Sequence, residues 1–496
     1  MKFKRILSFA CAVVMCAGML TGCKNSDESS AVTTTATTTS ATTTSTTTTV
    51  KTTTSEVNGD DPEVSTTESG NETTTSSVTT TTTTASESSA PESTTKKPDT
   101  TTTKKPVVTT SATTTKKPVT TTTKKPDVKP PVTQNGEMRD MSTQEIIEDM
   151  GVGINLGNTF ESCGSWINSS SVTNYETAWG SIQITEDIIA GYKEAGFGVI
   201  RVPVAWSNMI GSNYQINQKY IDRVKQVVDW IIENDMYAII NIHWDGGWIN
   251  NYNDSGMSFS KTYDECMKKY TTMWETLCYE FGGYGDHLMF ESLNEEGCWD
   301  DVWNRWGGTN GKSKAFGLLN GINQKFVDIV RASGGNNAKR HLLIAGYATD
   351  VDLTCDSMFK MPKDSAGRCA VSVHYYTPST FCILTEDADW GKASSTWGSS
   401  SEIKSLERYF DKLKTTFVDK GIPVIIGEYG CPHDNKDLES VRKFITTVST
   451  EAIERGICPV LWDTFDKNNP SKCFYNRKTC KMNDSVIAKN FLELSK

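Results

Sequence analysis

Two apolar runs in this chain end in glutamate, and this feature limits the possible folds more than any other. Residues 287–297 have the sequence HLMFESLNEEG, in which the apolar run stops at Asn-Glu-Glu. Residues 422–430 have the sequence IPVIIGEYG, in which Glu428 follows a run of Val and Ile. Short apolar runs bounded by turn residues are typical of buried strands. Two such strands that each deliver a carboxylate predict paired acids at the rim of a parallel barrel.

The same pattern recurs through the C-terminal part of the chain. Strands are expected at residues 151–156, 198–202, 237–243, 288–293, 341–345, 369–374, 424–428 and 458–462. Helical patterns separate them, at residues 186–195, 218–233, 263–279, 314–331, 402–418 and 438–455. Strands that alternate with helices predict an α/β fold, here a (β/α)8 TIM barrel over residues 136–496. Active sites of such barrels lie at the carboxyl ends of the strands.

The start of the chain is expected to be a targeting segment rather than part of the fold. Basic residues within the first five positions precede an apolar stretch at residues 6–20, and residues 20–23 (LTGC) resemble a bacterial lipobox. Residues 1–22 are therefore expected to be a lipoprotein signal peptide, with a lipid on the thiol of Cys23. An ordinary secretory signal is the alternative. Both predict export, the first to a bacterial cell surface.

Residues 23–135 are expected to form a disordered linker rich in Thr, Ser, Pro and Lys. This segment has almost no large apolar residues, so it cannot bury a core that offsets the entropy of ordering. The sequence TTKKP ends at positions 98, 106, 118 and 126, and a Thr- and Pro-rich chain favours an extended spacer. With a lipid at Cys23 it would act as a stalk, although a flexible linker without a reach requirement stays open.

The net charge and the cysteine spacing argue against a nucleic-acid-binding protein and against a zinc protein. A formal net charge of −10 argues against nucleic-acid binding, which needs a basic face. The cysteines after residue 135 form no CxxC pairs, so no zinc site is expected. Cys473 and Cys480 are close enough in sequence to form a disulfide, and the sequence leaves this open.

Six expected strands end in residues suited to acid/base chemistry, hydrogen bonding or stacking. These residues are Arg201, His243, Asn294 with Glu295, His374, Glu428 and Trp462. Each alone has an ordinary structural explanation, such as a helix cap, a buried ion pair or a core aromatic. Their coincidence at one rim instead predicts a functional site.

At these residues the sequence resembles family 5 glycoside hydrolases. Residues 288–295 look like the acid/base signature of that family, residues 425–430 look like its nucleophile strand, and residues 153–159 are similar to strand 1 of its endoglucanase-rich branch. The resemblance extends from about residue 141 to the C-terminus. Two departures are visible: Glu296 stands where the family usually has Pro, and Trp244 stands where many relatives have His.

The resemblance implies a retaining double displacement, with Glu428 as nucleophile and Glu295 as acid/base, their carboxyl groups about 5–5.5 Å apart. It also implies supporting roles for six residues. Arg201 would keep the nucleophile charged, Tyr376 would donate to it, Asn294 would bond the sugar 2-hydroxyl, His243 and His374 would bond hydroxyls or tune the carboxylates, and Trp462 would form a flat floor. No metal or organic cofactor is implied.

We therefore expect a surface-anchored, monomeric endo-β-1,4-glucanase (cellulase) acting on a β-glucan. Xyloglucanase, lichenase and β-mannanase activities are alternatives within the same family, because loops set the substrate. A non-catalytic glycan-binding lipoprotein and a solute-binding lipoprotein are alternatives from other classes. Eight tryptophans fall in expected βα loops, where further sugar subsites would lie: Trp166, Trp244, Trp248, Trp299, Trp303, Trp306, Trp390 and Trp397.

Overall fold

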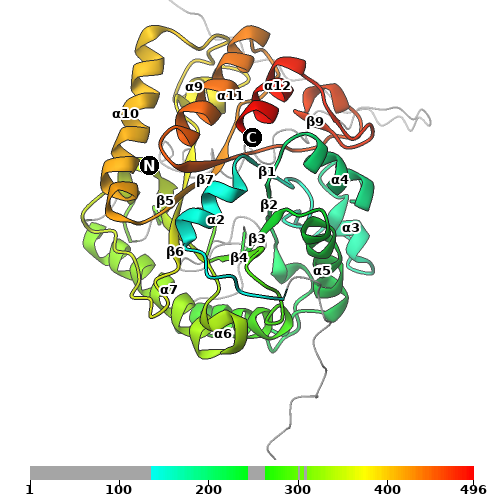
Figure 1. Ribbon diagram of the computed structural model, residues 1–496, viewed down its shortest axis with the longest axis vertical. Coiled ribbons are helices and arrows are strands. Elements are labelled where there is room, and N and C mark those ends of the chain that lie inside the picture. Colours follow the sequence, from blue (N-terminus) through cyan, green and yellow to red (C-terminus); the bar gives the residue numbers. More distant parts are fainter. Residues whose placement is uncertain (1–135, 244–262, 300–301, 307–309, 496) are drawn as a thin grey trace, which may run out of the picture. The chain divides into compact units, whose positions relative to one another are not determined.

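The protein is described by a computed structural model that covers residues 136–243, 263–299, 302–306 and 310–495. The expected signal peptide, Cys23, the linker and Trp244 lie outside the described residues. The predicted fold is confirmed: eight parallel strands close into a barrel in the order β1 to β8. Figure 1 shows these strands at the centre with the large helices around them.

The strands lie where the sequence pattern predicts them, with small differences at their ends. They are β1 (Gly153–Asn155), β2 (Val199–Val202), β3 (Tyr237–Asn241), β4 (Leu288–Glu291), β5 (Leu342–Asp350), β6 (Cys369–Tyr375), β7 (Val424–Tyr429) and β8 (Ile457–Leu461). The largest difference is β5, which continues to Asp350 past an irregularity in its pairing with β6. Apolar periodicity ends at residue 345, so it gave no sign of this extension.

The outer helices also match the helical patterns. They are α4 (Glu186–Glu194), α5 (Gln218–Glu233), α6 (Tyr263–Glu280), α7 (Lys312–Ala332), α10 (Ser400–Thr416) and α11 (Leu438–Ile453). The pattern did not predict the elements α2 (Thr143–Met150), α3 (Val172–Glu176), α8 (Val351–Thr354), α9 (Ser379–Cys382) and α12 (Ser485–Leu494), nor the antiparallel hairpin of β9 (Tyr475–Asn476) and β10 (Lys481–Met482). No helix in the described ranges combines the length and the apolar character that a membrane span requires.

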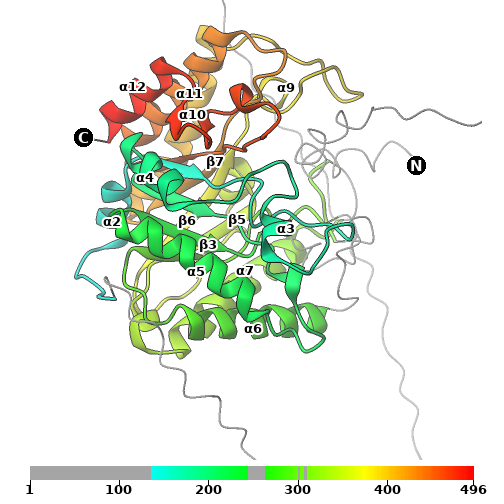
Figure 2. The same cartoon turned by 90° about the vertical axis from the view of Figure 1, so that its right-hand side faces the viewer.

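Helix α2 closes one end of the barrel. Ser142 and Glu145 form a capping box that starts the helix, because each side chain accepts from the other residue's backbone N–H. The apolar face of α2 then buries Ile146, Ile147 and Met150 against inward-facing strand residues. Figures 1 and 2 show α2 across this end, and Figure 2 shows α3 and α9 towards the other. Because α3 and α9 follow β1 and β6, that opposite end is where the strands finish.

The barrel interior changes from apolar to polar along the strands. Side chains alternate between the two faces of a strand, so positions two residues apart both point inward. One inward layer is apolar and packs towards α2: Val199, Ile239, Met289 and Ala370. Two residues further along the same strands, the layer is polar and fully buried: Arg201, Asn241, Glu291 and Ser372. This polar layer is the base on which the site is built.

The structure answers whether Cys473 and Cys480 form a disulfide, which the sequence left open. Cys473 and Cys480 are not joined by a disulfide.

Candidate active site

Arg201 at the end of β2 organises the site. Its side chain is fully buried, and its Nε donates to Glu291 Oε2 at 2.7 Å while its Nη1 donates to Glu428 Oε1 at 2.8 Å. The remaining N–H groups donate to Asn155 Oδ1 at 3.0 Å and Asn294 Oδ1 at 2.9 Å. A guanidinium suits this task because its donors form a rigid planar fork. One arginine therefore holds the expected nucleophile and the expected sugar-binding amide in fixed positions.

Glu428 is a buried carboxylate whose ionisation depends on its neighbours. Burial raises its pKa, whereas the interactions with His374 and Arg201 oppose that rise and the carboxylate of Glu295 adds to it. The hydroxyl of Tyr376 donates to Glu428 Oε2 at 3.0 Å. Burial, with the two carboxylates nearby, raises the pKa of Tyr376 well above its ordinary value. Tyr376 therefore stays neutral and keeps its proton for this bond.

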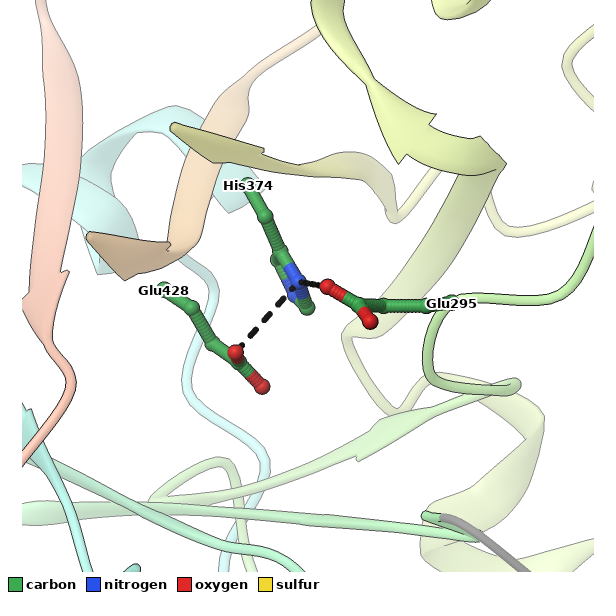
Figure 3. Close-up of side chains that lie close together, drawn as sticks. All are labelled: Glu295, His374 and Glu428. Atoms are coloured by element: carbon green, nitrogen blue, oxygen red, sulfur yellow. Dashed lines mark hydrogen bonds and ion pairs between the residues drawn. The ribbon is translucent and has the colours of Figure 1, made fainter. Parts of the chain in front are cut away.

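His374 lies between the two expected catalytic acids. A hydrogen bond of 2.7 Å joins its Nδ1 to Glu295 Oε1, and the same nitrogen is 3.6 Å from Glu428 Oε2 (Figure 3). One oxygen of each carboxylate and one nitrogen of His374 all lie within 4.8 Å of one another. Retaining glycosidases separate their carboxyl groups by about 5–5.5 Å and inverting ones by about 6.5–9.5 Å. The geometry fits retention.

The two acids differ in their access to solvent. The side chain of Glu295 is 27% exposed and that of Glu428 is not exposed at all. A proton donor that later activates water needs such access, and Glu295 has it. Within the described part of the chain, Glu295, His374 and Glu428 also form a group compact enough to hold a metal ion. The bond between His374 and Glu295 uses two of those donors, so the structure itself explains the grouping without a metal.

Glu296, the first departure from the family pattern, has a structural task. Its carboxylate accepts from Trp299 Nε1 at 3.0 Å, and its backbone carbonyl accepts from Ala348 N at 2.8 Å. The next residue, Gly297, has φ of 141°, and a Cβ there would lie 2.8 Å from Ala348 N. Glu296 thus ties the loop after β4 to the end of β5, while Glu295 points to the other acid.

His243 and Trp462 are two further expected site residues that the structure brings together. Their rings stack almost in parallel, with centroids 5.9 Å apart and an interplanar angle of 7°. His243 is buried, and its Nδ1 lies 3.3 Å from Asn241 Nδ2. Burial, followed by the charges of Arg201 and His374, lowers the pKa of His243 well below its ordinary value. It is a neutral imidazole, and its Nε2 has no hydrogen-bond partner among the described residues.

The two histidines that the sequence grouped together therefore differ. His374 contacts both acids, whereas His243 contacts Trp462 and Asn241 instead. Histidine at a strand end was a sufficient signal to find both. It could not separate them, because the neighbours come from other strands.

The loop tryptophans also divide once their burial is known. Trp299 and Trp397 are buried, while Trp166 is 65% and Trp306 is 52% exposed. Trp303 and Trp390 are half-buried, and Trp248, like Trp244, lies outside the described residues. Trp166 and Trp306 are therefore the most exposed of the loop tryptophans that the structure describes.

Sequence reasoning missed the buried polar layer below the acids. Glu291 accepts from Arg201, from Asn241 Nδ2 at 3.0 Å and from Ser372 Oγ at 2.8 Å. Asn155 Oδ1 accepts a hydrogen bond from Arg201, and Asn155 Nδ2 donates to the backbone carbonyl of Gly427 at 2.8 Å. A signal was present for Asn241, Glu291 and Ser372, which stand two positions after the inward apolar Ile239, Met289 and Ala370. A charged residue on an inward strand position is rarely buried without a partner.

Comparison with known proteins gives the family. The sequence profile described as "Cellulase (glycosyl hydrolase family 5)" matches residues 161–468. Endoglucanase A of Clostridium longisporum is 34% identical over 342 residues, a match that spans 68% of this chain and 63% of that protein. A xyloglucan-specific endo-beta-1,4-glucanase of Bacteroides ovatus is 32% identical over 66% of this chain and 66% of its own length.

Solved structures agree with this match. A GH5-4 broad-specificity endoglucanase from an uncultured bovine rumen ciliate is 36% identical, with a TM-score of 0.63 over 72% of this chain and 98% of that one. The GH5-4 broad-specificity endoglucanase of Ruminococcus champanellensis, solved with bound cellotriose, is 32% identical, with a TM-score of 0.63 over 72% of this chain and 99% of that one. This chain belongs to glycosyl hydrolase family 5, in the branch of the GH5-4 endoglucanases.

Proposed function

We propose that the protein is a retaining endo-β-1,4-glucanase that cleaves internal bonds of a β-glucan by double displacement. The observation that carries this proposal is the pair of carboxylates within 4.8 Å of each other at the strand ends, with His374 between them. Relatives named as endoglucanases support the substrate class, as does the cellotriose bound by one of them.

In the first step, Glu428 attacks the anomeric carbon and forms a glycosyl-enzyme, while Glu295 gives its proton to the leaving oxygen. In the second step, Glu295 takes a proton from water, which attacks the anomeric carbon and releases Glu428. Arg201 favours the ionised form of Glu428 against the effect of burial. The hydrogen bond from Tyr376 holds the carboxylate in line for attack.

Three other residues bind the sugar in this scheme. The oxygen of the Asn294 amide is held by Arg201, so its NH₂ group is the part left to donate to a substrate hydroxyl. The indole of Trp462 offers a flat apolar surface to a pyranose ring. His243 is neutral, and its Nε2, which has no hydrogen-bond partner in the part of the chain that the structure describes, is suited to a sugar hydroxyl.

The direct test is hydrolysis of a polysaccharide panel with sizing of the products. We expect mixed oligosaccharides from carboxymethylcellulose or lichenan, and a single small product would contradict endo action. Proton NMR early in the reaction should show the β anomer. An α product would rule out Glu428 as the nucleophile. No hydrolysis of any member of the panel, with retained binding, would favour a glycan-binding protein.

The preferred glucan is a finer question that the same panel addresses. One relative is named xyloglucan-specific, and another solved relative is named a lichenase. Both names support testing xyloglucan and lichenan beside cellulose. Mannan is included because β-mannanase activity is an alternative within the family.

We further propose that the protein is exported and held at a membrane by a lipid on Cys23, as a monomer. The lipobox-like sequence before Cys23 and the Thr-rich linker after it support this proposal. Mass spectrometry of the N-terminal peptide should find a lipid-modified Cys23. A Cys23→Ala variant should appear in the soluble fraction, and its retention in the membrane would contradict the anchor.

A further inference from the structure

We infer that Arg477 is a positioning residue: it fixes the loop after β1 and, through that loop, the indole of Trp462 on which a glucosyl ring would stack. The inference rests on the proposed function, because Trp462 has a task only where a sugar binds. Arg477 lies 15 positions after Trp462, in the turn between β9 and β10. Nothing in the sequence pattern connects it to the site.

The guanidinium of Arg477 donates four hydrogen bonds. The side chain is buried, and its Nη2 donates to the carbonyl of Gly157 at 2.9 Å. Its Nη1 donates to Thr159 Oγ1 at 2.9 Å and to Ser181 Oγ at 2.7 Å, and its Nε donates to the hydroxyl of Tyr192 at 3.2 Å. Two of these four partners belong to the loop that follows β1.

The same hairpin also holds the loop that follows β8. The carboxylate of Asp463, next in the chain to Trp462, accepts from Phe474 N at 2.8 Å and from Tyr475 N at 3.2 Å. Its backbone carbonyl accepts from Gly157 N at 3.1 Å. The hairpin therefore binds two loops that are also bonded to each other.

Gly157 is the residue through which the hairpin contacts Trp462. A Cβ at Gly157 would lie 2.6 Å from the carbonyl of Asp463 and 3.2 Å from Cζ2 of Trp462. The indole thus packs directly on the backbone that Arg477 holds. The same indole stacks on His243, so a shift of the Gly157 backbone should move Trp462 relative to the site.

Only an arginine can span these partners. A lysine at position 477 keeps the charge but has one ammonium group, which cannot reach Gly157 and Tyr192 together in the geometry of a planar fork. We expect Arg477→Lys to fold, to loosen the Gly157 backbone and to weaken binding of the glucosyl ring. Displacing a substrate-binding group by about 1 Å can lower the rate about a hundredfold. For the smaller shift expected here, we expect kcat/KM to fall about tenfold.

A second buried arginine provides the matched control. Arg340 is equally buried and donates five hydrogen bonds, to Asn337 Oδ1 and to the carbonyls of Phe281, Tyr284, Gly285 and Leu288. None of these partners contacts the acids or Trp462 in the described part of the chain. Arg340→Lys should therefore cost stability but leave kcat/KM within about twofold.

The test is a double-mutant cycle between positions 477 and 462. kcat and KM for cellotetraose are measured for wild type, Arg477→Lys, Trp462→Ala and the double variant, at a temperature where melting curves show all four to be folded. Arg477→Lys should lower kcat/KM about tenfold in wild type and less than about twofold once Trp462 is alanine. An undiminished loss in the Trp462→Ala background, or an equal loss from Arg340→Lys, would overturn the inference.

Two further measurements keep the test independent of folding and of the proposed function. If Arg477→Lys does not fold, Ser181→Ala removes one bond of the guanidinium and should give a smaller loss in the same cycle. Acrylamide quenching, taken as the difference between proteins with and without Trp462, needs no substrate. Arg477→Lys should increase the quenching of Trp462 and Arg340→Lys should not, even if wild type hydrolyses no glucan. Unchanged quenching would refute the positioning role alone.

Discussion

Replacing Arg201 by methionine tests the electrostatic argument at its centre. The guanidinium is fully buried and pairs with Glu291 at 2.7 Å and with Glu428 at 2.8 Å. Methionine has a similar length but no charge, so both carboxylates would remain buried without their cation. Breaking a buried ion pair from one side costs about 3–5 kcal/mol. A domain stable by about 5–15 kcal/mol should survive this, with a clearly lower free energy of unfolding.

The loss should depend on pH in a defined direction. Burial raises the pKa of Glu428, and Arg201 opposes that rise, so the pKa is higher still in Arg201→Met. A folded state with the higher pKa binds a proton that the unfolded state has released. The loss of unfolding free energy relative to wild type should therefore be smallest at acid pH and grow as pH rises. Urea denaturation across the pH range measures this.

Activity should shift in the same direction. A protonated Glu428 cannot attack, so the acid limb of the kcat/KM profile should move to higher pH, and the rate at neutral pH should fall at least about a hundredfold. Glu291→Gln should move the acid limb to lower pH, because Glu428 is then the only carboxylate that pairs with the Arg201 guanidinium among its described partners. An acid limb that stays in place in both variants would refute our account of how Glu428 is kept ionised.

Three further outcomes follow from the geometry. Glu295→Gln should remove most hydrolysis, while Glu296→Gln should keep it within about tenfold, because it faces Trp299; the reverse order in a reducing-sugar assay would exchange their roles. Gly157→Ala should raise KM for cellotetraose by displacing Trp462, and an unchanged KM would show that the indole can move without cost. Burial raises the pKa of Asp463 from 3.8 to about 7, so wild type should lose stability as pH rises through that interval; thermal melts of Asp463→Asn should show a smaller slope, because Glu161, whose pKa burial also raises to about 7, contributes the rest.

Much of the fold could be predicted because its signals are local. Each strand of the barrel is a short apolar run, and each outer helix has an apolar stripe with its own period, so both are visible in one segment of sequence. Helices α2 and α12 are about as long as α4, and their apolar faces were overlooked. The elements α3, α8 and α9 and the strands β9 and β10 are too short for such a period. They form because they cover apolar surface or cap loops that other parts of the chain create.

The acids of the site could be predicted for a related reason. Parallel strands bring their carboxyl ends to one rim, so Glu295 and Glu428 are expected to meet although they are far apart in the chain. Alternation along a strand ends where the strand ends, however, and β4 stops at Glu291. Beyond it strand alternation could not decide whether Glu295 or Glu296 faces the rim, and only the Asn-Glu order of the family signature favoured Glu295. The loop decided this through the bond from Trp299 and the backbone bond from Ala348.

By itself, then, the sequence determined the barrel, its order of strands and the residues at their carboxyl ends, because these depend on periodicity and on adjacency along the chain. Only the tertiary structure decided which charges face one another. Arg201 between Glu291 and Glu428, His374 between the acids, and Arg477 beneath Gly157 each join segments that no sequence period relates. A hydrogen bond and a burial-shifted pKa depend on distances of a few ångströms between such segments, and those distances exist only once the chain has closed into the barrel.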